Sequence, residues 1–547
     1  MKKRFPLVCI LCVAVAILTT ACPPAEINPP LNTVITAHGN TDWHIDTAEE
    51  FLFGTDMGGA PTAANHCPDT WTRRHMHVDL TNTNHFYYDK SLATPGDDTD
   101  AIDGIDQAML FFYAGHGSPT GWSTLGNHAT QPYVWLGNPP GEGLLRYYWQ
   151  CSCQVFAHGP RNCAGSTREY ACPGDFDGSA DSYNMRNVYE RWGAASSPIL
   201  RMACGASTLA FCHESEMNGI WNNYNNLSYD VADSFIDGLA GSSWVVPLCI
   251  TRGGEDVSNT PLYDTTFTNQ PNTSGSSHYH IQYLSDFASA PREVRLPSSD
   301  IPESLPVLEV GPLSLPEMLR GVEFETRDDF MLSPDEVAER GPRVRVNRLS
   351  GAVYVLGERK PAVEGPILEE REYIERALRF IEEQGWSERN LAGPVGRRFM
   401  IERTSVKGEQ DGVQQFQKNV IVTFKRQIDV DGVLVNVLGE GGVIEVQMNN
   451  DGSVLNAAKV WRQIASASAE EGVRVKTYEE SYEEAMEQIE EPQAYELDGW
   501  TWGYKEVAGN VEQTELRIVF HFWFVPADPG ALLEHPPQMI EVPGQSQ

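Results

Sequence analysis

Four apolar runs of strand length lie between positions 100 and 250, and polar turns or helical stretches separate them. An uninterrupted apolar run of this length is typical of a strand that is buried on both faces, as in a parallel sheet covered by helices. We therefore expect an α/β domain over residues 35–290, with a mainly parallel sheet and flanking helices. The runs are 109–114, 144–150, 199–203 and 244–250.

Helical spacing appears directly before the fourth run, where Val231, Phe235, Ile236 and Leu239 fall on one face of a helix. This order predicts a helix followed by a strand. In α/β sheets, ligand-binding and catalytic groups usually occupy the loops at the carboxyl ends of the strands. The ends of the four runs are therefore the places where chemistry is expected.

The pattern changes after residue 250. Residues 251–306 are rich in Thr, Asn, Ser, Gly and Pro, so we expect a loop and then a linker over 291–306. Beyond it we expect α+β accessory modules with antiparallel sheets at 307–465, and a C-terminal α+β module with a tail at 466–547.

Helix-capping and turn-forming residues predict particular elements in this second half. Pro366 and Gly385 bracket an amphipathic helix, and Thr477 with Glu480 forms a capping box that opens another. Asp431-Gly432 predicts a hairpin that joins 420–425 to 433–438, followed by a strand at 443–448. The aromatic runs near 500–504 and 520–524 predict core strands, with a carbohydrate-facing surface as the alternative.

Composition narrows the possible functions. The chain has 547 residues, enough for two to four domains, and its formal charge is −35. This negative net charge opposes binding to nucleic acid and to anionic lipid surfaces, which are themselves negatively charged. All 11 cysteines lie before position 250. We therefore expect any nucleophilic chemistry in the first half.

The N-terminus predicts export. Lys2, Lys3 and Arg4 precede an apolar run over 6–21 that is too short to span a bilayer in the usual way. The sequence up to Cys22 resembles a bacterial lipoprotein signal, with Cys22 as the lipidated residue. It departs from that pattern in having leucine four residues before the cysteine rather than three. We expect a signal at 1–22, a Pro-rich tether at 23–34, and a lipoprotein of the bacterial cell envelope, at the outer membrane or surface, which meets the membrane only through its lipid.

Export makes disulfides permissible. Without the signal segment eight cysteines remain, enough for four disulfides. If one is a catalytic thiol, a further cysteine must be unpaired, and we expect it in a buried strand such as that of Cys204 or Cys249. The eight are Cys67, Cys151, Cys153, Cys163, Cys172, Cys204, Cys212 and Cys249.

Two of the apolar runs lead into reactive residues. The first continues into Gly115-His116-Gly117-Ser118, and the second into Gln150-Cys151-Ser152-Cys153. A thiol and an imidazole at the ends of neighbouring strands can converge on one carbonyl, with backbone N–H groups as oxyanion donors. This arrangement predicts a cysteine hydrolase.

These two blocks resemble those of caspase-like cysteine peptidases, the group of caspases, metacaspases, legumains and gingipains. Met-Leu-Phe-Phe-Tyr-Ala-Gly-His-Gly-Ser over 109–118 is similar to their histidine block, and the strand ending at Cys153 is similar to their cysteine block. The resemblance covers roughly 35–290 and is stronger to an uncharacterised bacterial family with the same blocks. It implies a peptide or protein substrate, with Cys153 as nucleophile, His116 as proton donor to the leaving amine and Gly117 as an oxyanion donor.

Alternatives remain open. Cys204 also follows a strand and is an alternative nucleophile. His116 can be a turn residue, and disulfides at neighbouring cysteines would leave a non-catalytic, disulfide-stapled surface protein that binds partners. No cofactor is expected, although Asp175, Asp177 and Asp181 resemble a calcium loop in charge density. The second half weakly resembles the helix-on-sheet modules of peptidase propeptides, which assist or inhibit an attached enzyme.

Overall fold

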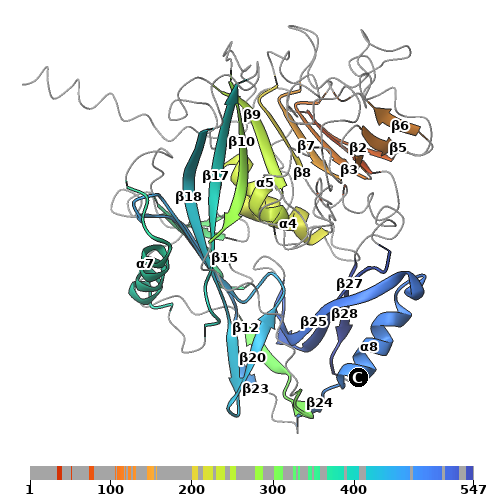
Figure 1. Cartoon of the computed structure of the whole chain (residues 1–547). Coiled ribbons are helices and arrows are strands. Elements are labelled where there is room, and N and C mark those ends of the chain that lie inside the picture. Colours follow the sequence, from red (N-terminus) through yellow and green to blue (C-terminus); the bar gives the residue numbers. More distant parts are fainter. Residues whose placement is uncertain are drawn as a thin grey trace, which may run out of the picture.

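The computed structural model (Figure 1) describes the chain in segments rather than continuously. The described residues are 34–39, 48, 51, 73–78, 105, 108–115, 117–118, 121–124, 127–130, 145–152, 156, 200–206, 214–225, 229–240, 247–253, 278–287, 301–311, 325–327, 330–332, 343–347, 350–357, 366–386, 391–405, 414–467, 472–507, 512–528 and 538–545.

Five parallel strands of the first half form one end of a 15-stranded sheet. Their order across the sheet is β2-β1-β3-β7-β8, and every neighbouring pair is parallel. The apolar runs predicted at 109–114 and 144–150 are therefore confirmed as strands, and the run predicted at 199–203 overlaps the start of β8. The bounds are β1 (Val34–Gly39), β2 (Arg73–Val78), β3 (Leu110–Ala114), β7 (Tyr147–Cys151) and β8 (Met202–Ala206).

The rest of this large sheet is antiparallel. Its order continues as β9-β10-β17-β18-β21-β22-β16-β15-β14-β13. The fourth predicted strand, β9, runs antiparallel to β8. The α/β character is confirmed, but the described sheet as a whole is mixed rather than mainly parallel. The bounds are β9 (Pro247–Gly253), β10 (His278–Asp286), β13 (Glu325–Arg327), β14 (Phe330–Leu332), β15 (Arg343–Asn347), β16 (Val353–Leu356), β17 (Val395–Ser405), β18 (Gln414–Lys425), β21 (Val443–Met448) and β22 (Val454–Val460).

Two helices, α4 (Glu214–Asn225) and α5 (Val231–Leu239), pack on each other and cover one face of the large sheet. The helix predicted from the 231–239 spacing is confirmed, and Asp230 caps it by accepting the backbone N–H of Asp233. Trp149 of β7 lies against Trp221 of α4, with ring centroids 5.6 Å apart. The parallel strands thus share their core with these helices.

The sheet continues without interruption across the boundary that the sequence predicts near residue 300. Strand β10 pairs with β17 along its whole length, from His278 opposite Ser405 to Asp286 opposite Arg397 (Figure 1). The core beneath α5 also contains Phe399 from the second half. The accessory region therefore shares a hydrophobic core with the first half and is not a separately packed module.

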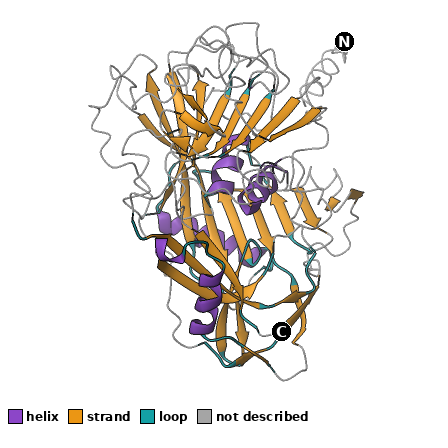
Figure 2. Ribbon diagram, turned by 90° about the vertical axis from the view of Figure 1, so that its right-hand side faces the viewer, coloured by secondary structure: helices purple, strands orange, loops and turns teal. Residues whose placement is uncertain are grey.

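Helix α7 (Glu370–Glu383) covers the other face of the antiparallel strands, using Tyr373, Ala377 and Ile381. The predicted helix is confirmed. Glu369 and Glu372 form its capping box, and Gly385 adopts a φ of +65° just beyond its end. Figure 2 shows the helices in purple among the strands of the molecule.

A further core lies beneath α8 (Tyr478–Glu487), whose Thr477–Glu480 capping box is confirmed. Phe520, Phe522 and Phe524 are buried there, so the prediction of core strands is confirmed for this aromatic run. The five-stranded sheet under the helix has the order β19-β20-β25-β27-β28. Its bounds are β19 (Gln427–Val430), β20 (Val433–Leu438), β25 (Tyr495–Lys505), β27 (Ile518–Pro526) and β28 (Gln538–Pro543).

The predicted pairing of 420–425 with 433–438 is wrong. Asp431-Gly432 does form a turn, but it joins β19 to β20. Strand β18 pairs instead with β17 and β21. The chain passes from one sheet to the other at Arg426, whose buried guanidinium donates to the carbonyl of Arg462 at 2.9 Å.

Small sheets complete the described elements. The segment after β3 forms β4 (Gly117–Ser118), β5 (Gly121–Thr124) and β6 (Asn127–Thr130). The remaining short strands, with the 3₁₀ helix Pro492–Ala494, flank the C-terminal core. They are β11 (Ser304–Leu305), β12 (Leu308–Gly311), β23 (Gln463–Ala467), β24 (Val473–Arg474) and β26 (Glu515–Leu516).

Candidate functional site

The carboxyl ends of three parallel strands lie side by side. Gly39 of β1 is opposite Ala114 of β3, and Ala114 is opposite Cys151 of β7. The chain order reverses between β1 and β3, which is the position where open α/β sheets bind their ligands. Gly115, the first residue after β3, donates its N–H to the carbonyl of Cys151 at 3.1 Å. The ends of β3 and β7 are thereby tied together.

The two residues predicted to carry the chemistry, His116 and Cys153, lie outside the described residues. Their neighbours are described. Gly115 precedes His116, and Gly117, the predicted oxyanion donor, begins β4 and pairs with Trp122. Ser152 directly precedes Cys153 and is buried. The structure therefore brings together the strand ends from which both residues continue.

Aromatic side chains pack on the face of β3 and β7 that is turned away from α4 and α5. Phe111 stacks on Tyr148 with ring centroids 6.1 Å apart. Burial raises the pKa of Tyr148 well above its usual value, and nearby Tyr113 adds to the shift. Tyr113 also lies over Gly115, where an added Cβ would be 2.3 Å from the tyrosine hydroxyl oxygen. A side chain at position 115 would therefore have to displace the Tyr113 ring.

The connection that follows β7 is anchored again at Phe156. Its N–H donates to the carbonyl of Ala206, at the end of β8, at 3.1 Å. Its ring lies over Gly205, where an added Cβ would be 2.1 Å from a ring carbon. Cys153 therefore lies in the sequence between two placed residues: Ser152 directly after the end of β7, and Phe156, which is bonded to the end of β8.

Two polar side chains at the end of β7 are buried and were not singled out from the sequence. Tyr148 donates its hydroxyl to Oε1 of Gln150 at 2.6 Å. Gln150 Nε2 and Ser152 Oγ have no hydrogen-bond partner in the part of the chain that is described. Buried polar atoms without partners are costly and need an explanation. Their position beside Cys153 adds hydrogen-bonding capacity to this strand end.

The cysteines of the central strands are oxidised. Cys204 of β8 and Cys249 of β9 stand opposite each other and form a disulfide. The expectation that one of them is unpaired is wrong, because the antiparallel pairing of β8 and β9 puts them side by side. In this state Cys204 has no thiolate, so it cannot serve as the alternative nucleophile. Cys151 is also disulfide-bonded.

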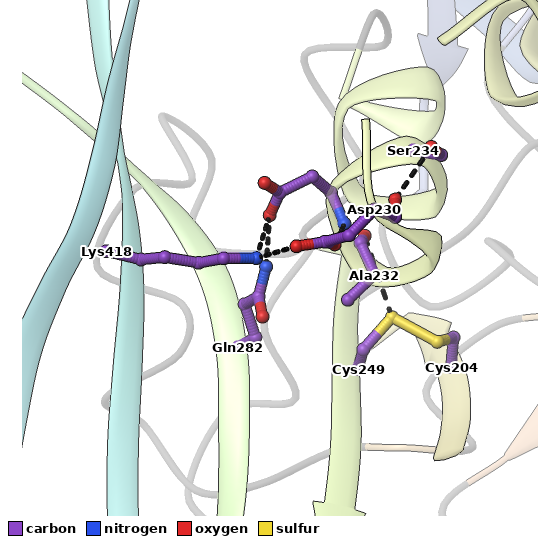
Figure 3. Close-up of a disulfide and its surroundings, with 8 residues drawn as sticks. Cys204, Asp230, Ala232, Ser234, Cys249, Gln282 and Lys418 are labelled. Atoms are coloured by element: carbon purple, nitrogen blue, oxygen red, sulfur yellow. Dashed lines mark hydrogen bonds and ion pairs between the residues drawn. A yellow bond between two sulfur atoms is a disulfide. The ribbon is translucent and has the colours of Figure 1, made fainter. Parts of the chain in front are cut away.

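A second polar cluster lies beneath α5, and sequence reasoning missed it. Lys418 of β18 forms ion pairs with Asp230 and Asp233 at the start of α5, and all three side chains are at most 4% exposed (Figure 3). Gln282 and Asn419 also donate to Asp233. The sequence offers no clear signal for this cluster, because Lys418 stands between Gln417 and Asn419 in the polar first half of its strand.

Two acidic groups extend this cluster. Burial, followed by the nearby carboxylate of Asp237, raises the pKa of Glu445 from 4.5 to about 7. Burial also raises the pKa of Asp237, while Arg397 and a hydrogen bond from Asn223 oppose that shift. Carboxyl groups with raised pKa values therefore lie between α5 and the antiparallel strands.

Other predicted sites fall outside the described residues. These include Cys22 with the signal and tether, and the acidic residues Asp175, Asp177 and Asp181. Within the described ranges, no group of His, Cys, Asp or Glu side chains is arranged to hold a metal ion. The helices described here include none that is long and apolar enough to cross a membrane.

Comparisons with known proteins give little. No protein-family model matches the chain. No curated protein matches it either. An uncharacterized protein from Eubacterium rectale has a TM-score of 0.26 at 9% identity, over 44% of this chain and 83% of its own. The C-terminal domain of YpeB from Bacillus megaterium has a TM-score of 0.21 at 10% identity, over 42% of this chain and 88% of its own. Similarity this low carries no argument about function.

Proposed function

We propose that this chain is an exported, lipid-anchored cysteine peptidase, with Cys153 as nucleophile and His116 as its acid–base partner. One observation carries the proposal: β3 and β7 are adjacent, parallel and in register, and His116 and Cys153 follow their ends. Two residues that begin from the same edge of a sheet can reach one substrate carbonyl.

In this mechanism the Cys153 thiolate attacks the scissile carbonyl, and His116 protonates the leaving amine. The N–H of Gly117 helps to hold the oxyanion. The absence of a side chain at Gly117 lets the backbone there approach a ligand closely, whereas the space beside Gly115 is filled by the Tyr113 ring. Hydrolysis of the acyl-enzyme by water then returns the thiol.

The finer fold assignment belongs to the same proposal. The order β2-β1-β3-β7-β8, with α4 and α5 on one face, supports a caspase-like α/β domain followed by antiparallel strands. The Cys204–Cys249 disulfide supports an oxidising compartment, as expected for an exported protein. Lipidation at Cys22 follows from the signal sequence alone.

Thiol labelling tests the proposal. An acyloxymethyl ketone peptide or iodoacetamide should label the purified protein at Cys153, and Cys153→Ala should abolish that label. His116→Ala should slow labelling because the imidazole no longer supports the thiolate. His128→Ala, on β6, is the matched control and should label like the wild type. Equal labelling of the His116 and His128 variants would mean that His116 has no part in activating Cys153.

A second function has support from the disulfides. Cys151 is oxidised, and it lies two residues before Cys153. If Cys153 is oxidised as well, the first half is a non-catalytic, disulfide-stapled scaffold that binds partners at the cell surface. Mass mapping of the non-reduced protein separates the two functions, because a peptidase retains a free thiol at Cys153.

A further inference from the structure

Lys418 reaches α5 because it occupies a β-bulge. On β17, Phe399 pairs with Asn419 and the next residue, Met400, pairs with Gln417, so Lys418 is the extra residue on β18. A bulge redirects a side chain out of the regular alternation of the strand. The Lys418 side chain, 4% exposed, extends to the N-terminal end of α5.

Two carboxyl groups meet the amine there. Asp230 is the N-cap of α5, and Asp233 lies in its first turn. The Nζ of Lys418 contacts Oδ2 of Asp230 and lies 2.8 Å from Oδ1 of Asp233. Figure 3 shows the amine reaching across from its strand to Asp230, with Gln282 beside it. Both carboxyl groups are at most 1% exposed.

The surroundings of the two carboxyl groups differ. Asp233 accepts hydrogen bonds from the side-chain amides of Gln282 and Asn419, which favour its ionised form. Oδ1 of Asp230 accepts the backbone N–H of Asp233 at 2.8 Å. A backbone N–H at a helix N-terminus stabilises negative charge on such an oxygen. Asp233 is therefore held in the form that can accept a proton, and Asp230 has a donor placed to hold the charge that develops on Oδ1 when its carbonyl carbon is attacked.

We propose that Lys418 and Asp230 form an intramolecular amide bond, with Asp233 moving the proton. A proton passes from the ammonium to the Asp230 carboxylate, which leaves a neutral amine beside a carboxylic acid. Nζ then attacks Cγ and forms the C–N bond, while the developing charge rests on Oδ1. Asp233 takes a proton from Nζ and delivers it to the Oδ2 hydroxyl, the C–O bond breaks, and one water leaves. No oxidant or reductant is required.

Physical arguments favour this reaction at this place. An amine held against one carboxyl group by two folded elements has an effective concentration far above that of free reactants. A buried ion pair pays a large desolvation penalty, which the neutral amide does not. The bond would join residues that are 188 positions apart. It would fasten the accessory region covalently to the first half, whether or not Cys153 is catalytic.

Intact mass spectrometry after denaturation and disulfide reduction tests the proposal. The wild type should be lighter than its mature sequence by one water, and a digest should contain one branched peptide that joins the segments of Lys418 and Asp230. Lys418→Arg keeps the positive charge, cannot form the amide, and should have its full mass. A wild-type chain with full mass and no branched peptide would refute the bond.

The Asp230→Asn variant tests the assigned roles. An asparagine at this position should lose one ammonia instead of one water, because its side-chain nitrogen becomes the leaving group. If this variant lost water, the bond would have formed at Asp233 and the roles of the two aspartates would be wrong. The branched peptide of the wild type identifies the joined carboxyl group independently, so the result does not depend on how well any variant folds.

Discussion

Because the two halves share one core, a cavity made in the second half should weaken the first. Phe399 of β17 is completely buried, and its ring meets Tyr229, which precedes α5, edge to face with centroids 6.5 Å apart. Phe399→Ala removes these contacts and should cost about 3–5 kcal/mol. Domains are typically stable by only about 5–15 kcal/mol, so this is a large fraction of the total.

Hydrogen exchange measures this effect in each strand separately. At about 1.4 kcal/mol per tenfold change, the expected loss speeds exchange through global opening by about 10²-fold to a few thousand-fold. The acceleration should appear in β3 and β7, although the substitution lies in β17. Leu378→Ala, on the outer face of α7 where the side chain is 43% exposed, is the control and should change stability by less than about 0.5 kcal/mol.

If Phe399→Ala speeds exchange only in β17 and β18 while β3 and β7 keep their wild-type rates, the halves unfold independently. The continuous sheet would then be a contact between two stable units rather than a shared core.

Three further predictions concern close packing and charge. Gly238→Ala places a Cβ 2.5 Å from the backbone nitrogen of Ile220, so urea unfolding should show a loss of about 1–3 kcal/mol in stability. Gly219→Ala is the control: its Cβ would come no closer than 3.4 Å to any neighbour, and its stability should be unchanged or higher. Gly115→Ala clashes with the tyrosine hydroxyl oxygen at 2.3 Å and should slow thiol labelling; an unchanged rate would show that this turn tolerates displacement. The folded-state pKa of Glu445, about 7, lies above its unfolded value, so the folded state binds more protons between about pH 4.5 and 7 and stability falls as pH rises through that window. Glu445→Gln should flatten this fall in pH-dependent thermal melts, and an unchanged slope would assign it to other groups.

Local signals predicted individual elements well. The spacing over 231–239, the capping box at Thr477 and the glycine at 385 each fix a helix through contacts within a few residues, and all three helices are present. The strand ends that precede His116 and Cys153 were also predictable, because an uninterrupted apolar run indicates a buried strand regardless of its partners.

Pairing between distant strands was not predictable. Strand β10 lies in a region rich in Thr, Asn, Ser, Gly and Pro, a composition that predicts a loop, and its partner β17 follows more than a hundred residues later. For the same reason the Cys204–Cys249 disulfide could not be predicted, because it depends on β9 pairing antiparallel with β8. The burial of Lys418 is explained only by its ion pair with Asp230, which belongs to the first half of the sequence. Periodicity describes the faces of an element but does not identify the partner that covers them.

The pairing of β10 with β17 also affects the time course of folding. A chain that emerges N-terminus first exposes β10 before its partner has been made, and an unpaired strand edge is a template for association with other chains. Contacts between distant segments form slowly because the loop between them must close first. Newly made protein should therefore pass through a period in which the first half is complete in sequence but open along one edge. During that period, aggregation competes with folding, and the arrival of β17 and β18 ends the competition.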